Sequence, residues 1–141
     1  MQERSTVELE NALSQSEQLG SFLEENADNM PQRTISERLA ALIVEKGVSK
    51  SSAIAASGLN DIYAHQIFAG KRKPSRDKLL CLCFGFALSA QEAQGLLRTC
   101  GYAPLYVKAR RDSIIYYAFC KKMTLLQCNE LLFDEKEAVL N

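Results

Sequence analysis

The sequence predicts an all-α protein, and three observations indicate it. Apolar residues recur at helical spacing, as the stripe of Ile and Leu side chains within residues 35–43 illustrates. The pattern of a helix capping box, Ser or Thr followed three residues later by Glu or Gln, begins at Thr34, Ser89 and Thr124, with a further candidate at Ser14. Neither a sustained apolar–polar alternation nor an Asn-Gly or Asp-Gly hairpin turn occurs.

The expected helices follow one another between glycine and proline breaks. An acidic helical segment around residues 5–27, with a break near Gly20, comes first. The remaining helices are predicted over residues 35–46, 50–57, 61–69, 76–87, 90–99, 111–122 and 125–133. Glycines and prolines mark the expected stops and breaks, at Gly47, Gly58, Gly70, Gly101, Pro31, Pro74 and Pro104.

Three parts of the chain differ in character. We expect an acidic N-terminal helical arm over residues 1–33, a helical domain over residues 34–100 and a C-terminal helical hairpin over residues 101–141. A weak repeat with an offset of 35 residues supports the hairpin, because residues 77–84 align with residues 112–119 and both copies read as helix, capped turn, helix. Residues 111–133 are therefore predicted to form a second packed hairpin.

The composition excludes several classes of protein. A length of 141 residues with 47% hydrophobic residues suits one compact domain rather than a disordered chain. No stretch approaches the ~20 apolar residues that span a bilayer. The first residues lack the basic and apolar regions of a signal peptide. We therefore expect a soluble cytoplasmic protein without a membrane partner.

Residues that carry catalytic or metal chemistry are sparse. The five cysteines lack the paired spacing of a zinc site and lie among apolar residues, so we interpret them as small buried hydrophobes in a reducing compartment. His65 is the single histidine, and neither a phosphate-binding loop nor a glycine-rich nucleotide fingerprint occurs. The sequence predicts a protein that is not an enzyme and that holds no cofactor and no metal. The five cysteines are Cys81, Cys83, Cys100, Cys120 and Cys128.

The formal net charge is zero, but the charges are unevenly distributed. Residues 1–30 carry seven acids against one arginine, a net −6, and residues 123–141 carry four acids against one lysine, a net −3. Residues 31–122 carry fifteen Lys and Arg against six acids, a net +9. A basic middle between acidic flanks can bind a polyanion, although the same charges also suit solvated helix faces.

The segment over residues 49–70 is the most informative of the chain. Two short helices joined through Gly58 match a helix-turn-helix, with Gly58 in the left-handed turn position and Asn60 as the N-cap of the second helix. Ile54, Ala64, Ile67 and Phe68 are expected to be buried. The opposite face of the second helix then presents Asp61, Ile62, His65 and Gln66.

Over residues 34–99, about half of the chain, the sequence resembles the phage-repressor (Cro-type, XRE-like) helix-turn-helix family. The resemblance rests on Ser49, Gly58-Leu59, Ile67-Phe68-Ala69-Gly70, the basic loop Lys71-Arg72-Lys73-Pro74-Ser75 and the Ser89-x-x-Glu92-Ala93 helix start. It implies a lambda-repressor-like five-helix domain that binds double-stranded DNA as a transcriptional regulator, with the C-terminal hairpin and the acidic N-terminal segment as additions.

The resemblance also implies how the contacts are divided. The second helix of the motif enters the major groove, with Asp61, Ile62, His65 and Gln66 facing the bases. Ser49, Lys50, Lys71, Arg72 and Lys73 are implied to contact phosphates. The basic pair Arg110-Arg111 either extends this stripe or starts a helix beside Asp112.

Two functions remain open at this point. The first is a sequence-specific DNA-binding regulator that acts as a homodimer. The second is a protein-interaction adaptor, antitoxin-like or anti-regulator, on a degenerate motif. Asp61 and Ile54 depart from the family pattern and leave open a motif that kept the fold and lost DNA affinity. Asp61 and the zero net charge favour the adaptor. A dimer or protein partner is expected to bind through the N-terminal arm or the C-terminal hairpin.

Overall fold

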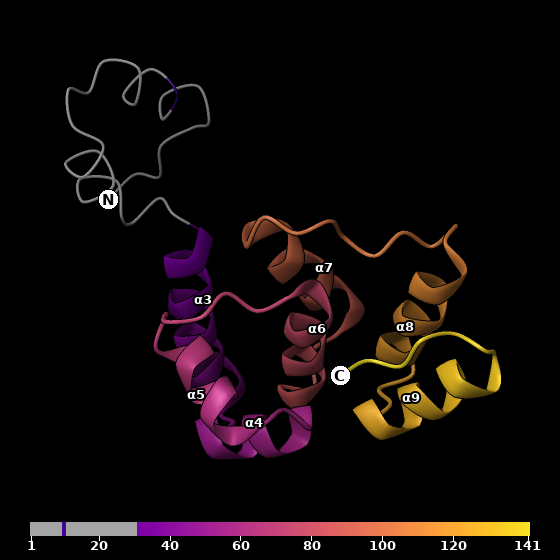
Figure 1. Ribbon diagram of the computed structural model, residues 1–141, viewed down its shortest axis with the longest axis horizontal. Coiled ribbons are helices and arrows are strands. Elements are labelled where there is room, and N and C mark those ends of the chain that lie inside the picture. Colours follow the sequence, from indigo (N-terminus) through magenta and orange to yellow (C-terminus); the bar gives the residue numbers. More distant parts are fainter. Residues whose placement is uncertain (1–9, 11–30) are drawn as a thin grey trace.

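The computed structural model describes residue 10 and residues 31–141, the side chains of residues 31–34 excepted. Within this part all regular structure is helical, which confirms the all-α prediction for it. The predicted helical segment around residues 5–27 and the Ser14 capping box lie outside the described residues, apart from residue 10. The helices are α3 (Pro31–Lys46), α4 (Lys50–Ser57), α5 (Asp61–Phe68), α6 (Arg76–Gly85), α7 (Ala90–Thr99), α8 (Arg110–Cys120) and α9 (Leu125–Asp134) (Figure 1).

Helix α6 is the centre of the described structure. Every residue from Leu79 to Gly85 is buried, which is the pattern of a helix surrounded by other elements. Figure 1 shows why, since α6 lies between α3, α4 and α5 on one side and the α8–α9 pair on the other. Gly85 allows α4 to approach closely, because a Cβ at this position would clash with the carbonyl oxygen of Ala53.

Three predicted helix boundaries are wrong by two residues or more. Helix α3 begins at Pro31, four residues before the predicted start, so Thr34 lies inside the helix and is not its N-cap. Proline is well suited to the first helical position because the missing N–H has no intrahelical acceptor there. Helices α6 and α8 each end two residues early, because Ala87 and Lys122 adopt φ angles of 53° and 54° that the sequence did not reveal.

The other two predicted capping boxes are confirmed. The Ser89 side chain accepts from the backbone N–H of Glu92, whose carboxylate accepts in return from the N–H of Ser89. Thr124 and Gln127 make the same exchange at the start of α9. Each box satisfies two backbone donors that the helix itself leaves without a partner.

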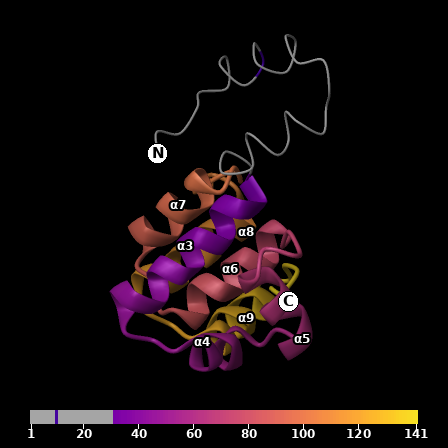
Figure 2. The ribbon, with the colours of Figure 1, turned by 90° about the vertical axis from the view of Figure 1, so that its left-hand side faces the viewer.

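The predicted C-terminal hairpin is present and packed. Helices α8 and α9 contact each other, α8 also contacts α7, and α9 also contacts α6. Turned by 90°, the structure shows α3 running diagonally across the face opposite this pair, in front of α6 (Figure 2). None of the helices in residues 31–141 has the length and apolar character that a bilayer crossing requires.

Candidate nucleic-acid interface

The turn between α4 and α5 has the conformation that the sequence predicted. Ser49 caps α4 by accepting from the N–H of Ser52 over 3.1 Å. Gly58 has a φ of 68°, in the left-handed region where a side chain is strained. Asn60 caps α5 by accepting from the N–H of Tyr63 over 3.1 Å. These local contacts fix where each of the two helices begins and ends.

The two faces of α5 are divided as the sequence predicted. Ala64, Ile67 and Phe68 are buried, as is Ile54 on α4. On the opposite face Asp61 and His65 are exposed, and Ile62 leaves 72% of its surface accessible. Gln66, which the sequence also places on this face, is half-buried.

The half-buried state of Gln66 has a specific cause. Its side-chain oxygen Oε1 accepts a hydrogen bond of 2.6 Å from Nε of Arg72. The backbone N–H groups of Lys71 and Arg72 both donate to the carbonyl oxygen of Gln66, over 2.9 and 3.3 Å. The basic loop is therefore attached to the last turn of α5, and the arginine holds the glutamine in one orientation.

Aromatic side chains support the cations around α5, although no sequence motif indicated these contacts. Tyr63 has the guanidinium of Arg72 5.4 Å from its ring centroid and Nζ of Lys78 5.2 Å from it. Lys73 lies 5.6 Å from the ring centroid of Tyr102. Such contacts hold a cation near an aromatic face without neutralising its charge. Tyr63 lies eight or more positions before these cations in the sequence, so no local pattern indicated the contacts.

Two further contacts complete this support. The hydroxyl of Tyr102 donates to the carbonyl oxygen of the buried Pro74, which joins the basic loop to the segment after α7. Nζ of Lys50, at the start of α4, lies 5.6 Å from the ring centroid of Phe68 at the end of α5. The predicted phosphate-contacting residues Lys50, Arg72 and Lys73 are thus tied to the same structural unit as α5.

The basic pair at the start of α8 does not extend this surface. Arg111 forms a two-bond ion pair with Asp77, and Arg110 pairs with Glu135 and Glu137. The interpretation in which the pair starts a helix is therefore the better one, since α8 begins at Arg110. The candidate cationic surface consists of Lys50, Lys71, Arg72, Lys73 and Lys78, and we call it the basic rim.

The cysteines conform to their predicted structural role with one exception. Cys81, Cys83, Cys100 and Cys128 are buried, whereas Cys120 is exposed. Burial raises the pKa of the thiols of Cys81, Cys100 and Cys128 to about 11, so they remain protonated and unreactive at neutral pH. Among the described residues, no three His, Cys, Asp or Glu side chains gather in a way that suits a metal ion.

Comparison with protein-family models, with curated proteins and with solved structures finds no match for this chain.

Proposed function

We propose that this protein is a sequence-specific DNA-binding transcriptional regulator that places α5 in the major groove. In this proposal α3–α7 form a lambda-repressor-like domain. The observation that carries it is the pairing of an exposed face on α5, with Ile62 72% accessible, and the basic rim around it. A helix with accessible side chains supplies base contacts, and flanking cations supply phosphate contacts.

The residues of α5 have distinct roles in this proposal. Gln66 donates to N7 of an adenine and accepts from its N6 amino group, which discriminates by about 1–3 kcal/mol. Its oxygen has two lone pairs, so Arg72 can keep one while the base takes the other. Ile62 packs on a thymine methyl group. His65 and Asp61 lie on the same exposed face, where Asp61 can accept from N4 of a cytosine.

The basic rim and the start of α4 contact the DNA backbone. Lys71, Arg72 and Lys73 are exposed after α5, and Ser49 is exposed at the N-terminus of α4. Backbone N–H groups at a helix N-terminus and nearby lysines both bind phosphate. A homodimer doubles these contacts and places the two half-sites about 34 Å apart along the duplex.

Selection of bound sequences from random duplex DNA, repeated at two salt concentrations, tests the proposal. We expect a recovered palindrome whose affinity falls steeply as salt is raised, because binding releases cations condensed on the phosphates and added salt opposes this release. If no consensus sequence is recovered, and the affinity for DNA is no greater than that of a protein without a cationic surface, sequence-specific DNA binding is contradicted.

Two substitutions separate reading of bases from attraction to phosphates. Arg72→Ala removes the brace on Gln66 together with a cation, so we expect both weaker binding and relaxed preference at one base pair. Lys71→Ala removes a cation without touching the Gln66 side chain, so we expect uniformly weaker binding and a salt slope lower by about one. Lys108→Ala, an exposed cation in the segment before α8, is the matched control and should leave binding unchanged.

A protein-interaction adaptor is the second candidate function. The exposed carboxylate of Asp61 beside the apolar side chain of Ile62 favours it, because an acid near phosphates is repulsive while such a pair suits a protein surface. The combined change Gln66→Ala, Lys71→Ala and Lys73→Ala distinguishes the two. A regulator loses operator binding after this change, whereas an adaptor retains its protein partner.

A further inference from the structure

The 35-residue repeat extends to the hydrogen bonds of the two hairpins. The side-chain amide of Gln94 on α7 clamps the backbone of Leu105, donating to its oxygen over 2.9 Å and accepting from its nitrogen over 2.6 Å. Asn129 on α9 clamps Leu140 in the same way, over 2.9 and 2.8 Å. Both partners are offset by 35 residues, and Leu105 and Leu140 are both buried.

The arginine at the start of each hairpin also makes equivalent hydrogen bonds in the two copies. Arg76 donates from Nε to the carbonyl oxygen of Ala103, and Arg111 donates from Nε to that of Ala138. Each arginine also bonds the next carbonyl oxygen, that of Pro104 or of Val139. Each hairpin therefore ties its own C-terminal segment to the start of its own first helix.

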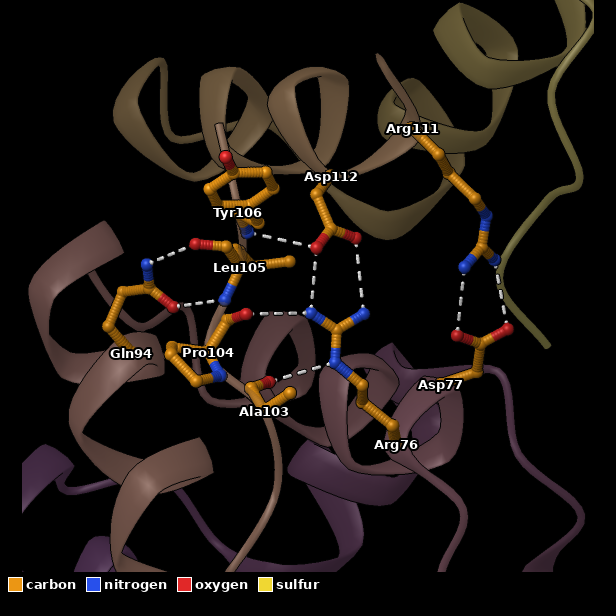
Figure 3. Close-up of polar contacts among 9 residues, drawn as sticks. All are labelled: Arg76, Asp77, Gln94, Ala103, Pro104, Leu105, Tyr106, Arg111 and Asp112. Atoms are coloured by element: carbon orange, nitrogen blue, oxygen red, sulfur yellow. Dashed lines mark hydrogen bonds and ion pairs between the residues drawn. The ribbon is translucent and has the colours of Figure 1, made fainter. Parts of the chain in front are cut away.

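The contacts between the two hairpins are reciprocal. Arg76 holds Asp112 through two hydrogen bonds of 3.1 and 2.8 Å (Figure 3). Arg111 holds Asp77 through two of 3.0 and 2.9 Å. The rings of Phe84 and Phe119, which are also offset by 35 residues, stack with centroids 4.0 Å apart and planes at 15°.

Reciprocal pairing of this kind defines a two-fold interface. When residue i of one copy contacts residue j of the other, and j of the first contacts i of the second, the copies are related by a two-fold axis. A residue that meets its own equivalent lies at the axis, as Phe84 and Phe119 do. Whole helices follow the same rule, since α8 is the equivalent of α6 and α9 is the equivalent of α7. Helix α6 contacts α9, and reciprocally α8 contacts α7.

We infer that residues 76–105 carry a docking face that binds a second hairpin of the same kind in a two-fold arrangement. Within one chain, residues 111–140 are the hairpin that occupies this face. The Arg76–Asp112 and Arg111–Asp77 pairs hold the face closed. The chain is thus a covalent pair of hairpins, and a homodimer has to use a different surface. This inference does not depend on DNA binding.

Full-length chains with complementary charges test the inference. A basic chain carries Asp77→Arg and Asp112→Arg, and an acidic chain carries Arg76→Asp and Arg111→Asp. Each chain alone has only like charges across the interface, which opens the face. In a mixture, the hairpins of one chain meet opposite charges on the other, so we expect a one-to-one heterodimer in native mass spectrometry that neither chain forms by itself.

Two controls make the result specific. A single chain with Asp77→Arg and Arg111→Asp keeps opposite charges within the chain and should remain monomeric. A second mixture carries the same number of opposite changes at exposed positions, with Lys108→Asp and Lys121→Asp in one chain and Glu130→Arg and Asp134→Arg in the other. No heterodimer from the interface variants, or equal association of the surface variants, would overturn the inference.

A further pair of variants locates the contact within the heterodimer. Phe119→Leu in both chains removes the ring stack at the proposed axis and should weaken the heterodimer about three- to tenfold. Phe133→Leu changes an α9 side chain that is 75% accessible and away from the axis, so it should leave the dissociation constant unchanged. Equal effects of the two changes would show that the chains associate elsewhere, which refutes the inference.

Discussion

The two hairpins share one backbone design but face different surroundings. On the α6–α7 hairpin α4 packs against α6 close to Gly85, and Leu82 and Phe86 are buried, with the Phe86 ring 6.1 Å from the Phe68 ring of α5. On the α8–α9 hairpin the equivalent positions are Tyr117, which is 48% accessible, and Lys121, which is exposed. Leu82 and Phe86 are thus buried in the copy against which α4 packs, whereas their counterparts in the other copy are accessible.

This difference separates two kinds of constraint on a helical hairpin. The capping boxes of α7 and α9, the left-handed turn residues and the amide clamps belong to the hairpin itself, and both copies keep them. The side chains on the outer side depend on which element packs against them, so the copy without α4 carries the partly polar Tyr117 and the polar Lys121 there. An equivalent substitution in the two copies should therefore have unequal effects wherever α4 makes contact.

The largest expected inequality is between Leu82 and Tyr117. Leu82→Ala leaves a cavity in the fully buried face of α6 and should cost about 2–5 kcal/mol of unfolding free energy. Tyr117→Ala removes a half-accessible side chain and should cost less than about 1 kcal/mol. Denaturant unfolding measures both values, and equal losses would mean that the outer sides of the two hairpins are similarly covered.

A smaller inequality is expected between Gly85 and Cys120, which occupy the equivalent positions at the ends of α6 and α8. Gly85→Ala places a methyl group against the backbone of Ala53, so α4 must move and about 1–3 kcal/mol should be lost. Cys120→Ala alters an exposed side chain and should change stability by less than about 0.5 kcal/mol. Thermal unfolding of the two variants, compared with the unchanged protein, decides whether α4 approaches only the first hairpin this closely.

Local features of the structure were predictable from the sequence. The capping boxes at Ser89 and Thr124 and the left-handed Gly58 depend on residues within a few positions of one another, and each forms as expected. The start of α3 was not predicted, because Pro31 begins the helix before the Thr34 pattern is reached. Ala87 was not recognised as a turn residue because its positive φ carries no glycine signal.

The long-range features could not be predicted from the sequence, for a different reason. The Arg76–Asp112 pair joins residues 36 positions apart, and sequence patterning does not state which charges meet across an interface. The repeat was visible, but its two-fold arrangement was not, because equivalent helices can also stack in a translational series. At the candidate interface, the exposed face of α5 followed from helical periodicity, whereas the brace from Arg72 to Gln66 needed the path of the loop.

The smallest expected effect concerns the two ion pairs that both hairpins share. Burial raises the pKa of the Asp112 carboxyl, but hydrogen bonds from Arg76 and from the N–H of Tyr106 outweigh this, and the net pKa is lowered. A lowered folded-state pKa gives stability that is present above the unfolded value of about 3.9 and is lost as the pH falls through the folded value. Asp112→Asn should therefore cost about 1–2 kcal/mol at pH 7.

The two proteins should converge in stability as the pH falls from about 4 through the lowered folded-state pKa of Asp112, because the unfolded chain of the unchanged protein takes up a proton there first and the folded protein follows, whereas the asparagine cannot titrate. Unfolding measured from neutral to acidic pH follows this convergence. Glu130→Gln, which alters an exposed carboxylate on α9 outside the interface, is the control and should show no comparable difference at pH 7. A constant gap between Asp112→Asn and the unchanged protein down to about pH 2 would mean that the ionised carboxylate does not stabilise the hairpin pair.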